Sequence, residues 1–418
     1  MPRHASWPIR MSAKPTLGSE NGRNERRPRR GLFPAILALL LLGIQQESAV
    51  AKTETTSVIT IGVVGPMSGG MAQLGRYVRQ AVEFQAEEWN EKGGLLGRRI
   101  QLLVEDDRDD PVEAVSAARR LVQAGIWGVI GHLTSAASLP ASAVYHAAGI
   151  PQITPSSTDP RLTEQRFRNL FRTCGRDDQQ GRVAAEFVLD TLDPRRVVVL
   201  HDMTPYGKAL AETFRRQIAR KDRRLLVATL VLLPGGKNME SVVDAVRAKE
   251  PDVVYFGGIF RDGGLLIKRL RERGVKAKLV SGDGMIGTEF INVAGEAAAT
   301  GTYLTFAPTP LRMPSAEAVI KRFQDRHGTI GPYTLYAYDA AGALFSAMAK
   351  AKPKSPSHSQ LRRVSQTLHR MTYKGALGRL RWDRKGDLIS QPYVIYQARK
   401  GGSFQGWFEQ VTGRQAEL

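Results

Sequence analysis

The sequence predicts an α/β protein of two doubly wound parallel-sheet lobes joined by a three-strand hinge. Three observations lead to this fold class. From Ser57 onward, short β-branched runs alternate with longer helical patterns, as in repeated βαβ units. The alternation breaks near Cys174 and then restarts, which indicates two similar domains. Helical patterns followed by strand-like segments come last, which indicates that the chain returns to both domains.

The first run begins with a buried strand over residues 58–65, which is continuously apolar and ends at Gly65-Pro66. The next helix has apolar residues near a 3.6-residue period and ends at Gly93-Gly94. Further on, Asp109-Asp110-Pro111 supplies a cap and a first-turn proline for another helix. The predicted strands are 58–65, 100–104, 129–130, 151–154 and 171–173, and the predicted helices are 74–91, 112–123 and 137–147.

The second run repeats this pattern, and three helices and two strands follow it. Its predicted helices are 179–191, 206–219, 238–248 and 262–273, and its strands are 197–200, 225–232, 253–256 and 278–281. The tail holds helices near 315–327, 334–350 and 358–370 and strands at 376–382 and 392–398. We expect an N-terminal lobe of residues 52–174 and 307–379 and a C-terminal lobe of residues 175–306 and 380–412. Three crossings between the lobes, the last near Leu380-Arg381, would form a hinge.

The first 51 residues have the layout of a secretory signal peptide. A basic stretch at 26–30 precedes an apolar run at 32–44, and Ala49-Val50-Ala51 offers a small-residue cleavage site. The apolar run is shorter than the roughly 20 residues of a membrane span. It contains no cysteine for lipid attachment. We therefore expect cleavage after Ala51 and release into the periplasm.

The chain is strongly basic, with a formal net charge of +20. Removal of the leader, which has eight Lys/Arg and three Glu, leaves +15. A basic protein is a candidate for nucleic-acid binding. However, the arginines after Ala51 are spread along the chain at helical spacing, which favours solvated helix faces. We expect no nucleic-acid partner.

Several rival chemistries find little support. Cys174 is the only cysteine, so no internal disulfide can form. The acidic cluster at 105–110 lacks the spacing and glycine of a calcium loop, and no metal or cofactor is expected. The glycines at 65–70 lack the Lys-Ser/Thr of a phosphate loop, and no G-x-S-x-G elbow occurs. His132 and His201 have no nucleophile within a few residues, so no catalytic residues are predicted.

An ordered set of motifs between residues 58 and 394 resembles the periplasmic branched-chain amino-acid-binding proteins. These are type I solute-binding proteins of ABC importers. The motifs are IGVVGPMSG at 61–69, NEKGG at 90–94, VIGHL at 129–133, ITPSST at 153–158, HD and YG at 201–202 and 206–207, and WDRKGD at 382–387. The resemblance implies capture of a small apolar amino acid between two lobes, and delivery to the transmembrane subunits of an ABC permease. It also implies a monomer that meets the membrane only through the transporter.

The same resemblance implies a set of ligand-binding residues. Ser135 and Thr158, with Ser156, fall where the family holds the ligand's carboxylate and ammonium, at loop-to-helix junctions that also suit simple capping. Tyr206 matches a tyrosine that reaches the ligand from the second lobe. Asp283 falls where relatives usually carry a glutamate that pairs with the ammonium.

The side-chain pocket departs from the family pattern at two positions. Leu74 and Ile259 stand where the branched-chain binders carry tyrosines, whereas Leu133, Thr134 and Tyr333 match the remaining lining. The resemblance thus implies an apolar side chain, aliphatic or aromatic. Two alternatives stay open: a ligand sensor of the same fold, and a binder of a carboxylate or amide solute that lacks the amino group.

Overall fold

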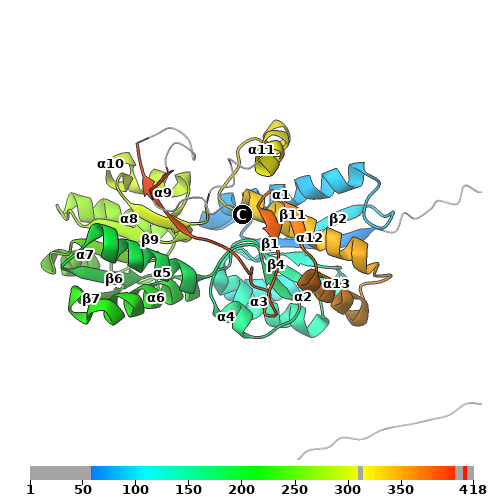
Figure 1. Ribbon diagram of the computed structural model, residues 1–418, viewed down its shortest axis with the longest axis horizontal. Helices are drawn as coiled ribbons and strands as arrows, with labels where there is room; N and C mark the ends of the chain where they lie inside the picture. Colours follow the sequence, from blue (N-terminus) through cyan, green and yellow to red (C-terminus); the bar gives the residue numbers. More distant parts are fainter. Residues whose placement is uncertain (1–57, 309–313, 401–407, 412–418) are drawn as a thin grey trace, which may run out of the picture. The chain divides into compact units, whose positions relative to one another are not determined.

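The computed structural model describes residues 58–308, 314–400 and 408–411, so the predicted signal peptide lies outside the described residues. Two sheets organise this part of the chain (Figure 1). None of the helices described there has both the length and the apolar character that a membrane span requires.

The smaller sheet has five parallel strands in the order β2-β1-β3-β4-β5. These are β1 (Ile59–Gly65), β2 (Ile100–Asp106), β3 (Val129–Ile130), β4 (Gln152–Thr154) and β5 (Leu170–Arg172). Its helices are α1 (Ala72–Glu91), α2 (Pro111–Gln123), α3 (Ser135–Ala148) and the short α4 (Arg161–Glu164). Strand β1 is completely or nearly buried, which explains its continuous apolar run.

The larger sheet has seven strands in the order β14-β13-β10-β9-β8-β6-β7. Its strands are β6 (Val197–His201), β7 (Leu226–Val231), β8 (Val253–Gly257), β9 (Lys278–Ser281), β10 (Tyr303–Phe306), β13 (Val394–Ala398) and β14 (Phe408–Gln410). The first five are parallel, and β10 among them was not predicted as a strand, while β13 and β14 add an antiparallel edge. The helices are α5 (Asp177–Phe187), α6 (Pro205–Asp222), α7 (Met239–Ala248), α8 (Phe260–Glu272), α9 (Thr288–Ala294) and α10 (Glu296–Ala299).

Both sheets reverse their strand order beside their first strand. Strand β1 lies between β2 and β3, and β6 lies between β7 and β8. Loops that leave the carboxyl ends of neighbouring strands diverge at such a point and leave a crevice between them. In each sheet, the loops at this point can therefore form one side of a ligand site.

The three tail helices are α11 (Pro314–His327), α12 (Thr334–Ala351) and α13 (His358–Arg370). Helix α12 packs on α1, β3 and β4, and α11 also contacts α1, so this segment returns to the smaller sheet. A separate hairpin of β11 (Tyr373–Gly375) and β12 (Gly378–Leu380) follows, where the sequence suggested one longer strand. Asp339 holds this hairpin by accepting from the N–H groups of Ala376 and Leu377 at 2.9 and 2.7 Å.

The last crossing between the sheets lies later than the expected boundary near Leu380-Arg381. The Trp382 Nε1 donates to the carbonyl oxygen of Arg172 at 2.8 Å, and the N–H of Arg172 donates to the carbonyl of Gly386 at 3.0 Å. Gly386 has a φ of 96°, and a Cβ there would lie 1.9 Å from the Leu170 carbonyl oxygen. The turn after β12 therefore packs on β5, and the chain reaches the larger sheet only at β13.

Candidate functional site

A cavity of about 110 Å³ lies between the loops at the carboxyl ends of the two sheets. Its lining includes every predicted ligand-binding residue except Thr158. The residues are Met71, Leu74, Asp109, Leu133, Thr134, Ser135, Ala136, Ser156, Thr204, Tyr206, Ile259, Asp283, Gly284, Ile286 and Tyr333. This volume is below the roughly 300–1,000 Å³ of sites for drug-sized ligands, so the cavity suits a small solute.

Asp283 is the buried carboxylate of this cavity, and it lies in the turn after β9. Its Oδ1 accepts hydrogen bonds from Gln180 Nε2 at 2.8 Å and Tyr206 Oη at 2.9 Å. Its Oδ2 accepts from Tyr333 Oη at 3.1 Å. Burial raises the pKa of Asp283, and the three donors oppose this shift. A carboxylate in this setting suits a cationic partner that enters the cavity.

The two tyrosines keep their hydroxyl protons in this setting. Burial, with the nearby charge of Asp283, raises the pKa of both Tyr206 and Tyr333 well above the usual value. Tyr206 also accepts a hydrogen bond from the N–H of Gly284 at 2.9 Å. Both phenols therefore act as fixed donors to Asp283 and orient its carboxylate.

Ser135 stands at the first position of helix α3, after the N-cap Thr134. Its Oγ accepts from the N–H of Asp159 at 3.2 Å, so its own proton is left for another acceptor. The first N–H groups of a helix have no partner within the helix and attract anions. Ser135 and the neighbouring Ala136 thus present donors to the cavity, as a ligand carboxylate requires.

Ser156 and Thr158 differ from each other in position. Ser156 lines the cavity, but its hydroxyl donates to the carbonyl of Leu133 at 2.6 Å. Thr158 is buried and absent from the cavity lining, and its Oγ1 has no hydrogen-bond partner among the described residues. The pKa of Asp177 is raised well above its usual value, first by burial and then by the charge of Asp283. The assignment of the Thr158 side chain to ligand binding therefore stays a prediction, since no described contact occupies its hydroxyl.

Apolar side chains form the remaining wall. Leu74 comes from the first turn of α1 and Ile259 from the cap of α8, so the two positions that depart from the family pattern both face the cavity. Leu133, Met71 and Ile286 complete this wall. The last two were not predicted, because one lies in a short turn and the other follows the Asp283 turn.

Asp109 is a second carboxylate of the lining that sequence reasoning assigned to a helix cap. It accepts from Thr134 Oγ1 at 2.7 Å, and Asp110 is the residue that caps α2. The pKa of Asp109 is raised from 3.8 to about 6, first by burial and then by the charges of Asp107 and Asp202, against the effect of Arg261. Asp202 follows β6 and Arg261 lies in the first turn of α8, both of the larger sheet, so charges from both sheets meet at this edge of the cavity.

The other carboxylates of the acidic cluster have separate structural partners. Glu105 pairs with Arg120 at 2.8 Å. Asp106 accepts from the N–H groups of Met67 and Arg108. Asp107 contacts Nδ1 of the buried His132 at 2.7 Å. Strand-end contacts and helix capping therefore account for this cluster.

Comparison with known proteins identifies this architecture. Residues 58–403 match the sequence model of the family described as periplasmic binding protein. An amino acid binding protein of Pseudomonas aeruginosa is 35% identical over 376 residues, which cover 88% of this chain and 96% of the relative. Leu/Ile/Val-binding protein homolog 1 of Brucella suis is 34% identical over 344 residues, which cover 82% of this chain and 91% of the relative.

Among solved structures, a leucine-binding protein from Thermotoga maritima superposes with a TM-score of 0.76 at 25% identity. The match covers 85% of this chain and 98% of that protein. The likeness therefore extends over both sheets and the tail.

Proposed function

We propose that this chain, which belongs to the periplasmic binding protein family, captures a small apolar amino acid between its two lobes and delivers it to an ABC permease. The names of its relatives support an amino-acid cargo of the branched-chain type. The family is one of binding proteins, so the proposed action is capture and release without chemical change.

One observation carries the proposal: a buried carboxylate, Asp283, shares a small cavity with the donors at the start of α3. An amino acid needs an acid for its ammonium, donors for its carboxylate and a pocket for its side chain. Asp283 would meet the first need and Ser135 with Ala136 the second. The wall of Leu74, Leu133 and Ile259 would meet the third.

The cavity also suits the free energy of capture. An amino acid of about nine heavy atoms that binds at about 1 μM requires roughly 8 kcal/mol, or about 0.9 kcal/mol per atom. This is below the ceiling of about 1.5 kcal/mol per atom for small ligands, and it requires nearly complete enclosure. Loops from both sheets line the cavity and would provide this enclosure.

We propose that the three crossings between the sheets act as the hinge of closure. They follow β5, follow β10 and precede β13. The N-terminal lobe then comprises residues 52–174 and the segment from 307 through the turn that packs on β5. The C-terminal lobe comprises 175–306 and the strands from β13 onward. We further propose that residues 1–51 direct export and are removed, and that the mature protein is a periplasmic monomer.

A thermal-shift screen of the mature protein against amino acids and simple carboxylates tests the proposed cargo. A ligand at a hundredfold its Kd stabilises the folded state by about 2.7 kcal/mol. We expect aliphatic or aromatic amino acids to raise the Tm and matched carboxylates without an amino group to fail. If the carboxylates succeed where all amino acids fail, the ammonium site assigned to Asp283 is wrong.

A further inference from the structure

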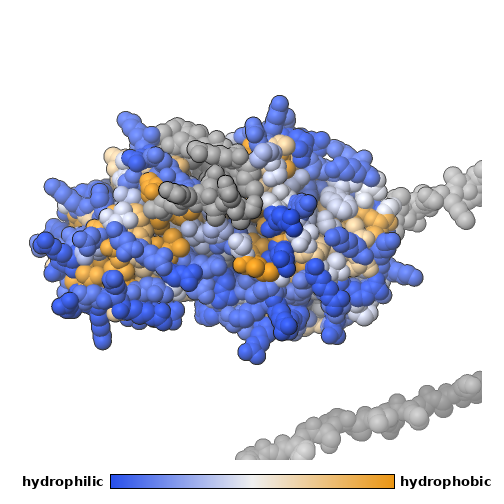
Figure 2. All heavy atoms as spheres, in the orientation of Figure 1, coloured by the Kyte–Doolittle hydropathy of each residue, from blue (hydrophilic) through white to orange (hydrophobic). Residues whose placement is uncertain are grey.

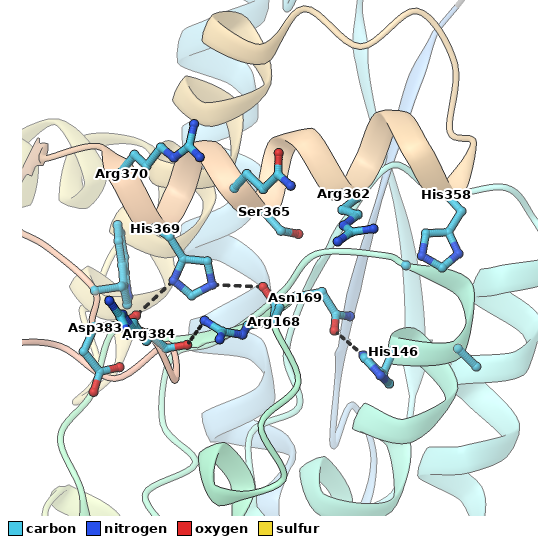
Figure 3. A pocket seen from close by; sticks show the side chains of 14 residues that line it. His146, Arg168, Asn169, His358, Arg362, Ser365, His369, Arg370, Asp383 and Arg384 are labelled. Atoms are coloured by element: carbon cyan, nitrogen blue, oxygen red, sulfur yellow. Dashed lines mark hydrogen bonds between the residues drawn. The ribbon is translucent and has the colours of Figure 1, made fainter.

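The largest described cavity lies away from the candidate amino-acid site. Its volume is about 840 Å³, and it lies between helix α13, the end of α3, the loop before β5 and the turn after β12 (Figure 3). None of its lining residues belongs to the amino-acid cavity. We call this space the basic groove and define it by Arg168, Arg362, Arg370, Arg384, His146 and His369.

The basic groove has strongly unbalanced charge. Four arginines line it, whereas Asp383 is the one carboxylate among its lining residues. The Oδ1 of Asp383 accepts from the N–H groups of Lys385, Gly386 and Asp387, at 2.7, 2.9 and 3.0 Å, so its own turn holds one of its two carboxylate oxygens. The sequence of α13, HSQLRRVSQTLHR, contains no acidic residue.

The guanidinium groups of the groove lack acidic partners in the part of the chain that the structure describes. No ion pair there involves Arg168, Arg362 or Arg384, whereas arginines of other helices, such as Arg79, Arg120 and Arg322, are paired. Figure 3 shows the side chains of Arg168 and Arg362 turned toward the space beneath α13. Their positive charge is therefore available to a ligand.

The floor of the groove is held in place by its own hydrogen bonds. His369 contacts the carbonyl oxygens of Asp383 and Arg168 through its two ring nitrogens, at 2.9 and 3.0 Å. Arg168 Nη1 donates to the carbonyl of Arg384 at 3.1 Å. Three segments distant in sequence are thus joined before any ligand arrives, which lowers the ordering cost of binding.

From this arrangement we infer that the basic groove binds a phosphate-bearing anion. A guanidinium offers a planar fork of donors, and one fork satisfies a carboxylate. Several forks around one concave space instead suit a tetrahedral phosphate, whose oxygens accept from several directions. Phosphate of this kind comes from a soluble molecule or from a lipid headgroup, and the two sources are distinguishable.

Calorimetric titration with pyrophosphate, and sedimentation with phosphatidylglycerol vesicles, test this inference on the mature protein. The groove variant is Arg168→Gln with Arg362→Gln, which removes two charges and keeps side-chain length. The matched control is Arg119→Gln with Arg247→Gln, two exposed arginines on α2 and α7 with the same loss of charge. Phosphatidylcholine vesicles are the lipid control.

We expect pyrophosphate to bind at about 50 mM salt, where screening is weak. The groove variant should bind about tenfold more weakly, or about 1.4 kcal/mol, and the control should stay within about twofold of the unmodified protein. If the protein binds phosphatidylglycerol vesicles and pyrophosphate displaces it from them, the ligand is a lipid headgroup. If the protein binds pyrophosphate but not these vesicles, the ligand is a soluble anion. The inference is overturned if both variants lose the same affinity for pyrophosphate. It is also overturned if neither probe binds, or if only an acidic peptide binds.

Discussion

The hydroxyl of Tyr333 donates to Oδ2 of Asp283 at 3.1 Å and to the Asp283 carbonyl oxygen at 3.3 Å. Tyr333 caps helix α12, which packs on the smaller sheet, whereas Asp283 follows β9 of the larger sheet. The two sheets are therefore joined inside the candidate site by one side chain, without a ligand. Both residues are buried, whereas most of the face shown in Figure 2 is hydrophilic.

Replacement of Tyr333 by Phe should weaken amino-acid binding by about tenfold, mainly through faster release. Hydrogen bonds to charged groups contribute about 1.5–3 kcal/mol, and Asp283 would retain two of its donors. Stopped-flow measurement of dissociation checks this prediction. The control is Tyr338→Phe, which removes a hydrogen bond to Glu88 far from the cavity lining. Equal rates in the two variants would contradict a role for Tyr333 in closure.

Asp283→Asn should weaken amino-acid binding at least about tenfold, because a neutral amide cannot pair with the ligand's ammonium. The amide oxygen can still accept from Tyr206 or Gln180, so the fold should survive. Asp283→Glu keeps the charge and should retain most of the affinity. Isothermal titration calorimetry measures these effects, with the exposed Asp244→Asn as control. Unchanged affinity in Asp283→Asn would remove this residue from the site.

Ser135→Ala should reduce affinity more than Ser156→Ala does. The Ser135 hydroxyl proton is left for the ligand, whereas the Ser156 proton is already donated to Leu133. We expect a loss of about 1.5–3 kcal/mol for Ser135→Ala, the range for a hydrogen bond to a charged group. Titration of both variants with one amino acid gives the comparison. A larger loss in Ser156→Ala would reverse the assigned roles.

Asp109→Asn should change how stability depends on pH. The pKa of Asp109 is raised to about 6 in the folded state, so its stabilising contribution is complete below pH 3.8 and is lost as the pH rises through about 6. Asparagine keeps the acceptor for Thr134 and tolerates the φ of 57° at this position. The difference in the free energy of unfolding between the variant and the unmodified protein should shift by about 2 kcal/mol in favour of the variant when the pH is raised from about 4.5 to about 7.5. Urea unfolding at both pH values measures the difference, and a constant difference would contradict the assignment.

Arg172→Met should lower the free energy of unfolding by about 3–5 kcal/mol, because it breaks a buried ion pair with Asp387 and removes the donor of two buried carbonyl oxygens. Asp387 keeps its second partner, Arg176, whose Nη1 lies 2.6 Å from its Oδ2. Arg172 is fully buried, pairs with Asp387 at 2.8 Å, and donates to the carbonyl oxygens of Ser157 and Asp159. Arg79→Met disrupts the solvent-exposed pair with Glu83 and should cost less than about 1 kcal/mol. Denaturant unfolding of both variants measures the two losses of unfolding free energy. Losses of similar size would contradict the prediction.

Much of the fold could be predicted because its signals are local. Apolar runs such as residues 58–65 and caps such as Asp110 lie within the elements that they define. The last crossing could not be placed, because it depends on Trp382 packing against Arg172 in a distant strand. No local pattern reports such a contact.

The candidate site was predicted mainly through family positions. These brought Ser135, Tyr206 and Asp283 to one cavity, whereas Thr158 lies outside its lining and its role stays a prediction. Asp109 was missed because Asp-Asp-Pro matches a helix cap equally well. The basic groove escaped detection altogether, since it forms only when α13 meets the loop before β5.

The pairing of Trp382 with Arg172 spans 210 residues and has a consequence for how the protein is made. Strand β5 emerges from the ribosome early, yet the indole and carboxylate that close over it are among the last parts synthesised. Contacts of such sequence separation form late in folding. A growing polypeptide therefore cannot complete the contacts of β5 before residues 382–387 have been synthesised.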